Sequence, residues 1–249
     1  MSRGVLLNAI YELGAWCTSV VVKQADGTII HGRNLDYPDE VTMQAIVYNG
    51  TFTRNGEEVF NAVMFAGNIG VYTGVRNNSF SVSQDTRHFL KHYSSLLANI
   101  IMLFTGFAEQ SWLMREALET CAHYDCAHKM LRDVPINGFG YLIVAGTEGD
   151  QGVVLSRDRF GAAHEDFLDS ANDKWFLVQT NSDHWKDGCT KRCAATTQGI
   201  EDVGRDNINV HTLRGVMETN PQLNHMTLFN SQFIPSQNYH DTVPEYYNR

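Results

Sequence analysis

The order of secondary-structure patterns along the chain limits the folds that it can adopt. Strand patterns occupy residues 18–65 and return between residues 141 and 179, and a helical period separates them over residues 88–132. One more helix is expected at 208–219 and a late strand at 226–233. Strands that come in runs, rather than alternating singly with helices, favour an α+β fold with helices layered on antiparallel sheet.

The individual strands are bounded by turn signals. Residues 18–24 and 28–31 flank the turn sequence Ala-Asp-Gly at 25–27, which is typical of a β-hairpin. Further strands are expected at residues 41–48, 51–54, 58–65, 141–145, 152–156 and 175–179. The strand patterns therefore predict several antiparallel connections.

The helical middle of the chain has one apolar face. Trp112, Leu113, Leu118 and Cys121 fit that face, and a second helix after Asp125 is expected to end before Pro135. Because proline cannot continue a helix, it marks the end of this segment.

The composition narrows the class of protein. The chain has 249 residues, of which 43% are hydrophobic and five are proline, and it contains no internal repeat or Pro/Gly/Ser-rich linker, so we expect one core and no domain boundary. A formal charge of −9 makes binding to nucleic acid improbable, since such binding depends on clustered cations. The longest apolar stretch, residues 96–107, is shorter than the roughly 20 residues that span a bilayer. No Gly-rich phosphate motif occurs, and we expect no cofactor.

Cys17 stands at the start of the first strand of the predicted hairpin. The hairpin returns its second strand beside this start, so that Arg33 and Asp36 would lie within reach of Cys17. A guanidinium favours a neighbouring thiolate, and a carboxylate can orient the guanidinium or an amine. Two interpretations stay open: a reactive cysteine, or a buried structural cysteine beside an ordinary salt bridge.

A second polar segment, residues 179–186, follows the strand expected at 175–179. Asn181 at the end of a strand can direct its side-chain N–H groups at a developing oxyanion. An asparagine that only forms a turn or a cap is the alternative.

The remaining cysteines and two histidines allow other interpretations. Five cysteines are an odd number, so at least one is unpaired within the chain, and Cys189 and Cys193 could form a local disulfide. Two groups suggest metal ligands but match no common zinc spacing: Cys121 and Cys126 with His128, and His88 with His92. We expect a partly buried helix cysteine and solvated histidines there, and no metal.

Several ordered blocks of sequence together resemble the acid ceramidase / N-acylethanolamine acid amidase family, and the Asn-Leu-Asp-Tyr-Pro run is closer to the amidase branch. The resemblance extends from about residue 5 to at least residue 233. The blocks are LLNAIYE (6–12), CTSVV (17–21), IHGRNLDYP (30–38), GNIGVYTG (67–74), VLSRDR (154–159) and VQTNSDHWK (178–186).

The resemblance implies an N-terminal nucleophile hydrolase, with an αββα sandwich of antiparallel sheets, that is made as an inactive precursor. The precursor would cut its own Trp16–Cys17 bond. Residues 1–16 would be the remnant of an α-subunit or propeptide and residues 17–249 the catalytic domain, with an α/β heterodimer as a possible product.

The chemistry of such a cut requires a nucleophile at this position. A Cys17 thiolate can attack the preceding carbonyl and take the acyl group onto sulfur, and water then releases a new N-terminus. The new α-amine has an ordinary pKa of about 7.7–8.0 and can accept the proton of its own thiol.

The resemblance also assigns roles to single residues. Cys17 would be the nucleophile and, after cleavage, the α-amine base, while Arg33 and Asp36 orient it and Asn181 stabilises the oxyanion. The last polar residue of the family pattern lies in an acidic-acidic-Arg-Arg-Thr stretch, where this chain has Cys-Thr-Lys-Arg-Cys at 189–193. We assign that role to Arg192, with Lys191 as the lesser candidate.

Two further departures concern the pocket. Asn68 and Ser182 stand where the family has Tyr, and both would change the pocket wall and with it the preferred acyl chain or head group.

The function implied is a cysteine amidase that hydrolyses fatty-acid amides, N-acylethanolamines or ceramide, in a lysosomal or other acidic lumenal or secreted compartment. A bile-salt or penicillin-type acylase and a non-maturing lipid-binding pseudo-enzyme are the alternatives. The N-terminus has no clear signal peptide, and two sequons, at Asn49 and Asn77, could carry glycans. Protonation of all ten histidines would change the formal charge from −9 to +1, which would favour contact with an anionic membrane surface.

Overall fold

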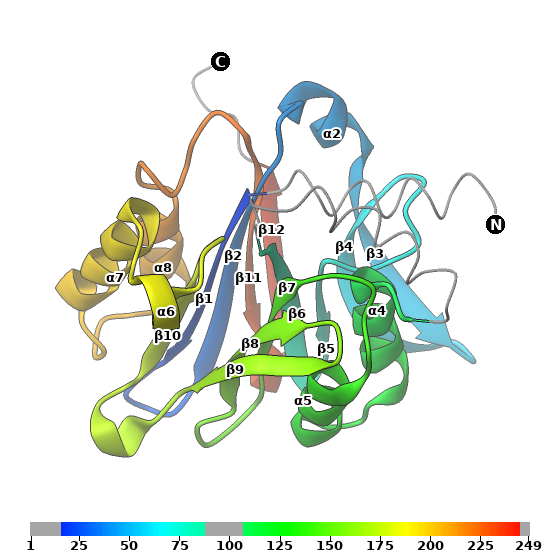
Figure 1. Cartoon of the computed structure of the whole chain (residues 1–249), viewed down its shortest axis with the longest axis horizontal. Coiled ribbons are helices and arrows are strands. Elements are labelled where there is room, and N and C mark those ends of the chain that lie inside the picture. The colour runs from blue at the N-terminus through cyan, green and yellow to red at the C-terminus, as the bar shows by residue number, and fades with distance from the viewer. Residues whose placement is uncertain (1–15, 88–106, 245–249) are drawn as a thin grey trace.

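Two antiparallel sheets form the centre of the molecule. The computed structural model describes residues 16–87 and 107–244, and Figure 1 shows the two sheets stacked against each other. The smaller sheet has the strand order β10 (Phe176–Gln179), β1 (Trp16–Lys23), β2 (Ile29–Asp36), β11 (Thr227–Ile234) and β12 (Tyr239–Pro244). The larger sheet has the order β3 (Val47–Arg54), β4 (Glu57–Phe65), β5 (Thr73–Arg76), β6 (Phe80–Thr86), β7 (Gly140–Ala145), β8 (Gly152–Asp158) and β9 (Gly161–Phe167).

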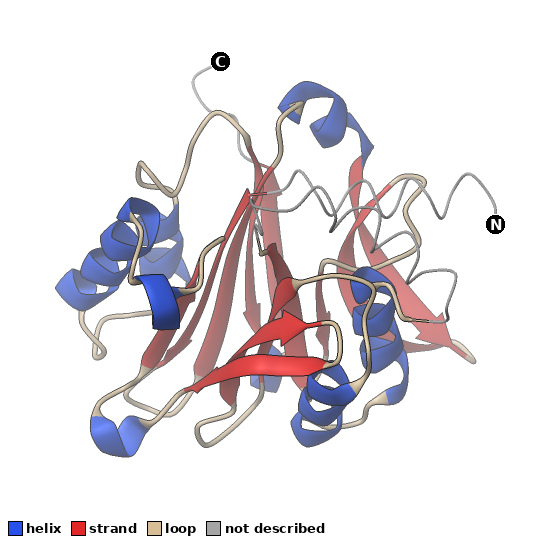
Figure 2. Cartoon of the chain, viewed as in Figure 1, coloured by secondary structure: helices blue, strands red, loops and turns tan. Residues whose placement is uncertain are grey.

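Helices cover the outer face of each sheet (Figure 2). The larger sheet is covered by α4 (Gln110–Thr120) and α5 (Tyr124–Asp133), and the smaller sheet by α7 (Lys191–Val203) and α8 (Val210–Met217). Shorter helices are α2 (Glu40–Ile46), α6 (His184–Asp187) and the 3₁₀ turns η1 (Ser170–Asn172) and η2 (Pro235–Gln237). The layers run helix, sheet, sheet, helix, which confirms the α+β sandwich expected from the sequence.

The alternation of side chains along β1 shows why the sandwich has two kinds of core. Val20 and Val22 point outward to Ile200 of α7 and Leu213 of α8. Val21 points inward, where it belongs to a cluster shared by both sheets. Because successive strand residues face opposite sides, one apolar strand serves both layers.

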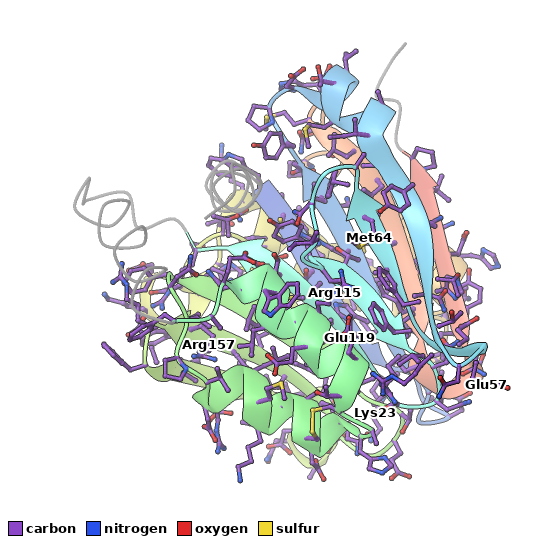
Figure 3. All side chains as sticks on the ribbon, turned by 90° about the vertical axis from the view of Figure 1, so that its right-hand side faces the viewer. Lys23, Glu57, Met64, Arg115, Glu119 and Arg157 are labelled. Atoms are coloured by element: carbon purple, nitrogen blue, oxygen red, sulfur yellow. A yellow bond between two sulfur atoms is a disulfide. The ribbon has the colours of Figure 1, made fainter. Side chains whose placement is uncertain are left out.

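Polar side chains fix the ends of the helices. The Thr190 side chain accepts a hydrogen bond from the N–H of Cys193 and caps α7, and Asn209 forms a capping box at the start of α8. At the C-terminal end of α5, the buried Arg157 donates to the carbonyl oxygens of Leu131 and Val134, the latter at 2.7 Å (Figure 3).

The strand predicted at residues 41–48 is wrong. The chain forms α2 there, and a strand begins only at Val47. Pro38 and Asp39 precede the helix, the N–H of Met43 bonds to the carbonyl oxygen of Asp39, and Val41 is exposed. The apolar residues of this segment therefore do not alternate into a sheet.

The helical middle of the chain is confirmed in part. Residues 88–106, which include His88, His92 and all but the last residue of the apolar stretch 96–107, lie outside the described residues. In α4, Leu113 and Leu118 are buried as expected, but Trp112 is 45% exposed and stacks on the Arg115 guanidinium. Trp112 lies about 100° around the helix from Leu113, which places it outside the buried stripe. Figure 3 shows the same outer side of α4, where Arg115 pairs with Glu119 at 2.7 Å.

The cysteines between these helices form a disulfide rather than a partly buried helix thiol. Cys121 ends α4 and bonds to Cys126 in the first turn of α5, which itself begins at Tyr124 and ends before Pro135. The spacing of five residues fits the short turn between the helices.

Among the helices that the structure describes, none has the length and apolarity needed to cross a membrane.

Candidate active site

The β1–β2 hairpin brings the predicted residues together. In the antiparallel register Cys17 lies opposite Leu35, Ser19 opposite Arg33, and Trp16 opposite Asp36. The side chain of Arg33 reaches the start of β1, where its Nη2 donates to Cys17 Sγ at 3.2 Å. The hairpin thus places a cation beside Cys17, the one free cysteine among the residues that the structure describes.

The Arg33 guanidinium is held by the larger sheet. Its Nη1 donates to the carbonyl oxygen of Tyr72 at 2.7 Å and to the hydroxyl of Thr73, and its Nη2 donates to the carbonyl oxygen of Gln84 at 2.6 Å. Arg33 is 1% exposed. The cation therefore has a fixed position in a dry space between the sheets.

The Cys17 thiol is protonated in this state. Cys17 is completely buried, and burial raises the pKa of its thiol to about 12 although Arg33 opposes the rise. Trp16 directly precedes Cys17, is 43% exposed, and lines the pocket described below. With Trp16 attached to Cys17, the sulfur is thus both neutral and buried.

Asn181 bonds directly to the backbone of Cys17. Its Oδ1 accepts from the Cys17 N–H at 2.9 Å and from Nη2 of Arg192 at 2.6 Å. Its Nδ2 donates to the carbonyl oxygen of Thr86 at 2.8 Å. Asn181 follows β10, the neighbour of β1, which accounts for its position.

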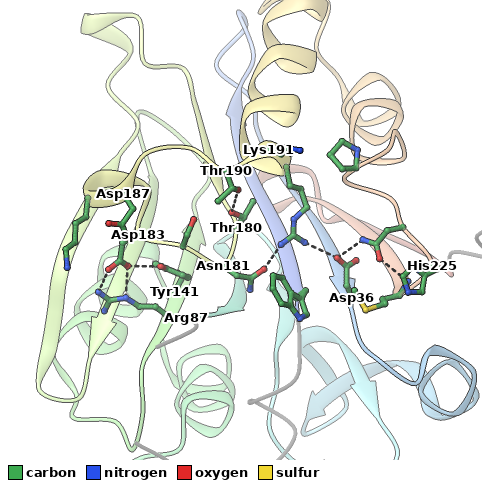
Figure 4. A pocket seen from close by; sticks show the side chains of 17 residues that line it. Asp36, Arg87, Tyr141, Thr180, Asn181, Asp183, Asp187, Thr190, Lys191 and His225 are labelled. Atoms are coloured by element: carbon green, nitrogen blue, oxygen red, sulfur yellow. Dashed lines mark hydrogen bonds and ion pairs between the residues drawn. The ribbon is translucent and has the colours of Figure 1, made fainter. Parts of the chain in front are cut away.

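Arg192 links Asn181 to Asp36. Its Nη1 lies 2.9 Å from Asp36 Oδ2, so one guanidinium in the first turn of α7 holds both residues (Figure 4). Lys191 also lines the pocket but is exposed and makes neither contact. Of the two candidates, the geometry favours Arg192.

Asp36 is fully buried and fully hydrogen-bonded. Its Oδ1 accepts from the Thr227 hydroxyl at 2.7 Å, and its Oδ2 also accepts from Asn224 Nδ2 at 3.0 Å. Burial raises the pKa of this carboxyl, and Arg192 is the strongest opposing influence. Its fixed oxygens make Asp36 an anchor for Arg192.

A buried polar chain beside Cys17 was missed in the sequence. Asp85 Oδ1 accepts from the Ser19 hydroxyl at 2.7 Å, Ser19 bonds to Ser83 at 2.9 Å, and both Ser83 and Ser81 bond to the ring of His31 at 2.9 Å. Ser81, Ser83 and Asp85 alternate along β6. That period-2 polar face is the signal that could have identified the chain.

The pKa values of the two titratable groups at the ends of this series of hydrogen bonds are shifted. Burial raises the pKa of Asp85 to about 7, and burial with the nearby Arg33 charge lowers the pKa of His31 to about 3. Asp85 in turn raises the thiol pKa of Cys17. The interpretation that all ten histidines become charged in acid is therefore wrong for His31.

A pocket of about 840 Å³ is lined by Trp16, the residue before Cys17, and by Asp36, Asn181 and Arg192 (Figure 4). At one end Arg87 binds Asp183 through Nε at 2.7 Å, and Tyr141 donates to the same carboxylate at 2.7 Å. The residues that line the pocket are Trp16, Asp36, Arg87, Tyr141, Thr180, Asn181, Ser182, Asp183, Lys186, Asp187, Thr190, Lys191, Arg192, Pro221, Asn224, His225 and Met226.

Of the two residues that stand where the family has Tyr, only one lines this pocket. Ser182 lines the pocket, whereas Asn68 does not and instead accepts a hydrogen bond from the Gly70 N–H at 2.8 Å within a turn. The expected effect of Asn68 on the pocket wall is therefore wrong.

The second disulfide is the local pair that the sequence allows. Cys189 and Cys193 are joined at the start of α7, on either side of Lys191 and Arg192.

Two stacked antiparallel sheets covered on both outer faces by helices, with a cysteine at the start of an inner strand, define the N-terminal nucleophile hydrolase fold. The chain belongs to the family of N-acylethanolamine-hydrolyzing acid amidase, because it covers 93% of a solved member at 34% identity. A family model for linear amide C–N hydrolases of the choloylglycine hydrolase family matches residues 17–137. That match begins at Cys17.

The curated relatives are longer than this chain. N-acylethanolamine-hydrolyzing acid amidase of Mus musculus is 34% identical over 92% of this chain and 63% of the relative, and acid ceramidase of Homo sapiens is 29% identical over 90% and 61%. The chain thus spans slightly less than two thirds of these relatives.

Solved structures support the same grouping. The Caenorhabditis elegans ortholog of N-acylethanolamine-hydrolyzing acid amidase matches with a TM-score of 0.82 and 34% identity, over 88% of this chain and 93% of that one. A conjugated bile acid hydrolase mutant from Clostridium perfringens matches with a TM-score of 0.51 at 10% identity, over 92% of each chain. The second likeness shows the fold alone.

Proposed function

We propose that this protein is a cysteine amidase that hydrolyses fatty-acid amides, N-acylethanolamines or ceramide, to a free fatty acid and an amine. The observation that carries the proposal is the position of Cys17, whose sulfur lies 3.2 Å from Arg33 and whose nitrogen lies 2.9 Å from Asn181 Oδ1. The relatives named for acting on such amides supply the substrate class.

The protein first cuts its Trp16–Cys17 bond. The Cys17 sulfur attacks the Trp16 carbonyl carbon, the C–N bond breaks as the nitrogen takes up a proton, and a thioester forms. Water then hydrolyses the thioester to the Trp16 carboxylate and the Cys17 thiol. Departure of Trp16 uncovers the sulfur toward the pocket that Trp16 now lines.

The new α-amine changes the acid–base properties of the site. It accepts the thiol proton, and Asn181 Oδ1 and Asp36, through Arg192, orient it. The thiolate attacks the substrate carbonyl, the ammonium returns its proton to the leaving amine, and water hydrolyses the acyl-enzyme. Asn181 Nδ2 carries two hydrogens, and the one that Thr86 does not accept stabilises the oxyanion.

Residues 17–249 form the catalytic domain in this proposal, and residues 1–16 belong to the segment that is cut off or kept as the partner of a heterodimer. The words acid amidase and acid ceramidase in the names of the relatives support an acidic compartment.

Intact mass and the N-terminal residue test the proposal. Wild-type protein incubated at acidic pH is expected to begin at Cys17 and to hydrolyse palmitoylethanolamide or ceramide, and Cys17→Ala is expected to do neither. Preference for glycocholate would instead identify a bile-salt acylase. Protein that stays uncut and inactive, or a Cys17→Ala variant that still cleaves, would refute the mechanism.

A further inference from the structure

Three side chains of types that bind metals lie close together between the end of β10 and the first turn of α7. None of them takes part in the proposed reaction. His184 Nδ1 lies 3.4 Å from Cys193 Sγ, and the ligand atoms of His184, Cys189 and Cys193 all lie within 4.8 Å of one another. In the structure the two cysteines are joined as a disulfide.

We propose that reduction of the Cys189–Cys193 disulfide creates a zinc site from Cys189, Cys193 and His184. A phosphine reductant supplies the two electrons and becomes a phosphine oxide with oxygen from water, whose hydrogens make the two thiols. Zn²⁺ then binds both sulfurs as thiolates and releases two protons. The inference does not depend on the proposed amidase activity.

The spacing of His184 and Cys193 fits tetrahedral zinc. With Zn–N near 2.0–2.1 Å and Zn–S near 2.3 Å, the two ligand atoms are about 3.5 Å apart. The observed separation is 3.4 Å. The two sulfurs on one zinc are about 3.8 Å apart, so one sulfur of the reduced pair has to move away from the other. Cys189 is exposed and precedes the helix, so a side-chain rotation there meets little obstruction.

The His184 ring is already oriented by its other nitrogen. Nε2 lies 2.8 Å from the Thr180 hydroxyl, which in turn lies 3.3 Å from the hydroxyl of Thr190. A hydrogen bond on the second nitrogen is typical of zinc-binding histidines. Nδ1 also lies 3.2 Å from the Val178 carbonyl oxygen, so binding requires the tautomer with its proton on Nε2.

The other disulfide provides a matched contrast. Cys121 and Cys126 also have a histidine nearby in sequence, but His128 Nε2 bonds to Glu165 Oε2 at 2.7 Å and its ring stacks on Tyr124. The His128 ring is thus already paired with a carboxylate. Of the two groups, His184, Cys189 and Cys193 alone offer three ligands with a fourth position left open for water.

Cobalt(II) absorption tests the inference in the full-length chain. Phosphine-reduced wild-type protein is expected to bind one Co²⁺ per chain with a thiolate charge-transfer band, and one equivalent of Zn²⁺ is expected to displace it. The same band is expected in the Cys121→Ser/Cys126→Ser variant. It is expected to be absent in Cys189→Ser/Cys193→Ser, and His184→Ala is expected to bind at least tenfold more weakly.

Several outcomes would overturn the inference: no band in reduced wild-type protein, a band of equal strength in oxidised protein, or a band that survives in Cys189→Ser/Cys193→Ser. Circular dichroism of each variant checks folding. If the double variant does not fold, the comparison of reduced with oxidised wild-type protein and the single His184→Ala variant decide the question.

Discussion

Asn181 Oδ1 accepts a hydrogen bond from the backbone N–H of Cys17 at 2.9 Å. The side chain therefore already holds the nitrogen that, in the proposed reaction, becomes the α-amine. In that reaction Asn181 would contact both the bond that is cut and the amine that then acts as the base.

Asn181→Ala is expected to lower kcat for amide hydrolysis by about 10²–10³, since removal of one oxyanion donor has an effect of that size. Self-cleavage should slow as well, which a time course of intact mass would measure. Asn68→Ala, which changes a turn hydrogen bond outside the pocket, is the control. Equal rates for Asn181→Ala and wild type would remove Asn181 from the mechanism.

Arg192→Ala is expected to lower kcat by more than tenfold, because loss of the guanidinium frees Asn181 and leaves Asp36 buried without its cation. The neighbouring Lys191→Ala is the matched control and should stay within about twofold of wild type. Steady-state kinetics on one amide substrate would measure both. A larger loss for Lys191→Ala would reverse the assignment.

Asp85→Asn is expected to change how stability depends on pH. The Asp85 carboxyl has a pKa of about 7 when folded and an ordinary value of 3.8, so between these values the folded chain holds a proton that the unfolded chain has lost. This contribution is complete below pH 3.8 and disappears as the pH rises through about 7. The Tm of Asp85→Asn relative to wild type should therefore increase from pH 4 to pH 7.5, and a difference independent of pH would contradict the argument.

His31→Gln is expected to reduce sensitivity to acid. The pKa of His31 is about 3 when folded, against an ordinary 6.5, so the unfolded chain binds the extra proton between these values. Wild-type stability gained from neutral His31 is present above pH 6.5 and falls as the pH drops toward 3. Thermal unfolding at pH 4.5 and pH 7 should show a smaller difference for the variant, with the exposed His211→Gln as control. A pH dependence identical to that of wild type would contradict the expectation.

The sequence predicted the parts of the site that local patterns encode. A turn signal at 25–27 predicts a hairpin, and a hairpin from Cys17 necessarily returns near Arg33. The sequence also predicts that Asn181 follows the end of a strand. The resemblance then supplied Arg192, which no spacing rule connects to β1.

The parts that were missed depend on contacts between distant segments. Asp85 and His31 occur in strand patterns, and only the stacking of two sheets makes their polar side chains neighbours. Cys121 and Cys126 pair because a tight turn joins two helices, which periodicity alone does not show. At α2, the alternation of apolar residues was ambiguous between strand and helix.

The contacts of Arg33 with Tyr72 and Gln84, and of Asn181 with Thr86, join the smaller sheet and the segment after β10 to backbone within and next to the larger sheet. The surroundings of the Cys17 sulfur therefore depend on how the two sheets are stacked. A substitution deep between them, such as Gly152→Ala, whose new methyl group would meet Leu168 at 2.5 Å, can alter the chemistry without touching the pocket. In the proposed reaction, the packing between the two sheets would therefore affect the rate as much as the residues that line the pocket do.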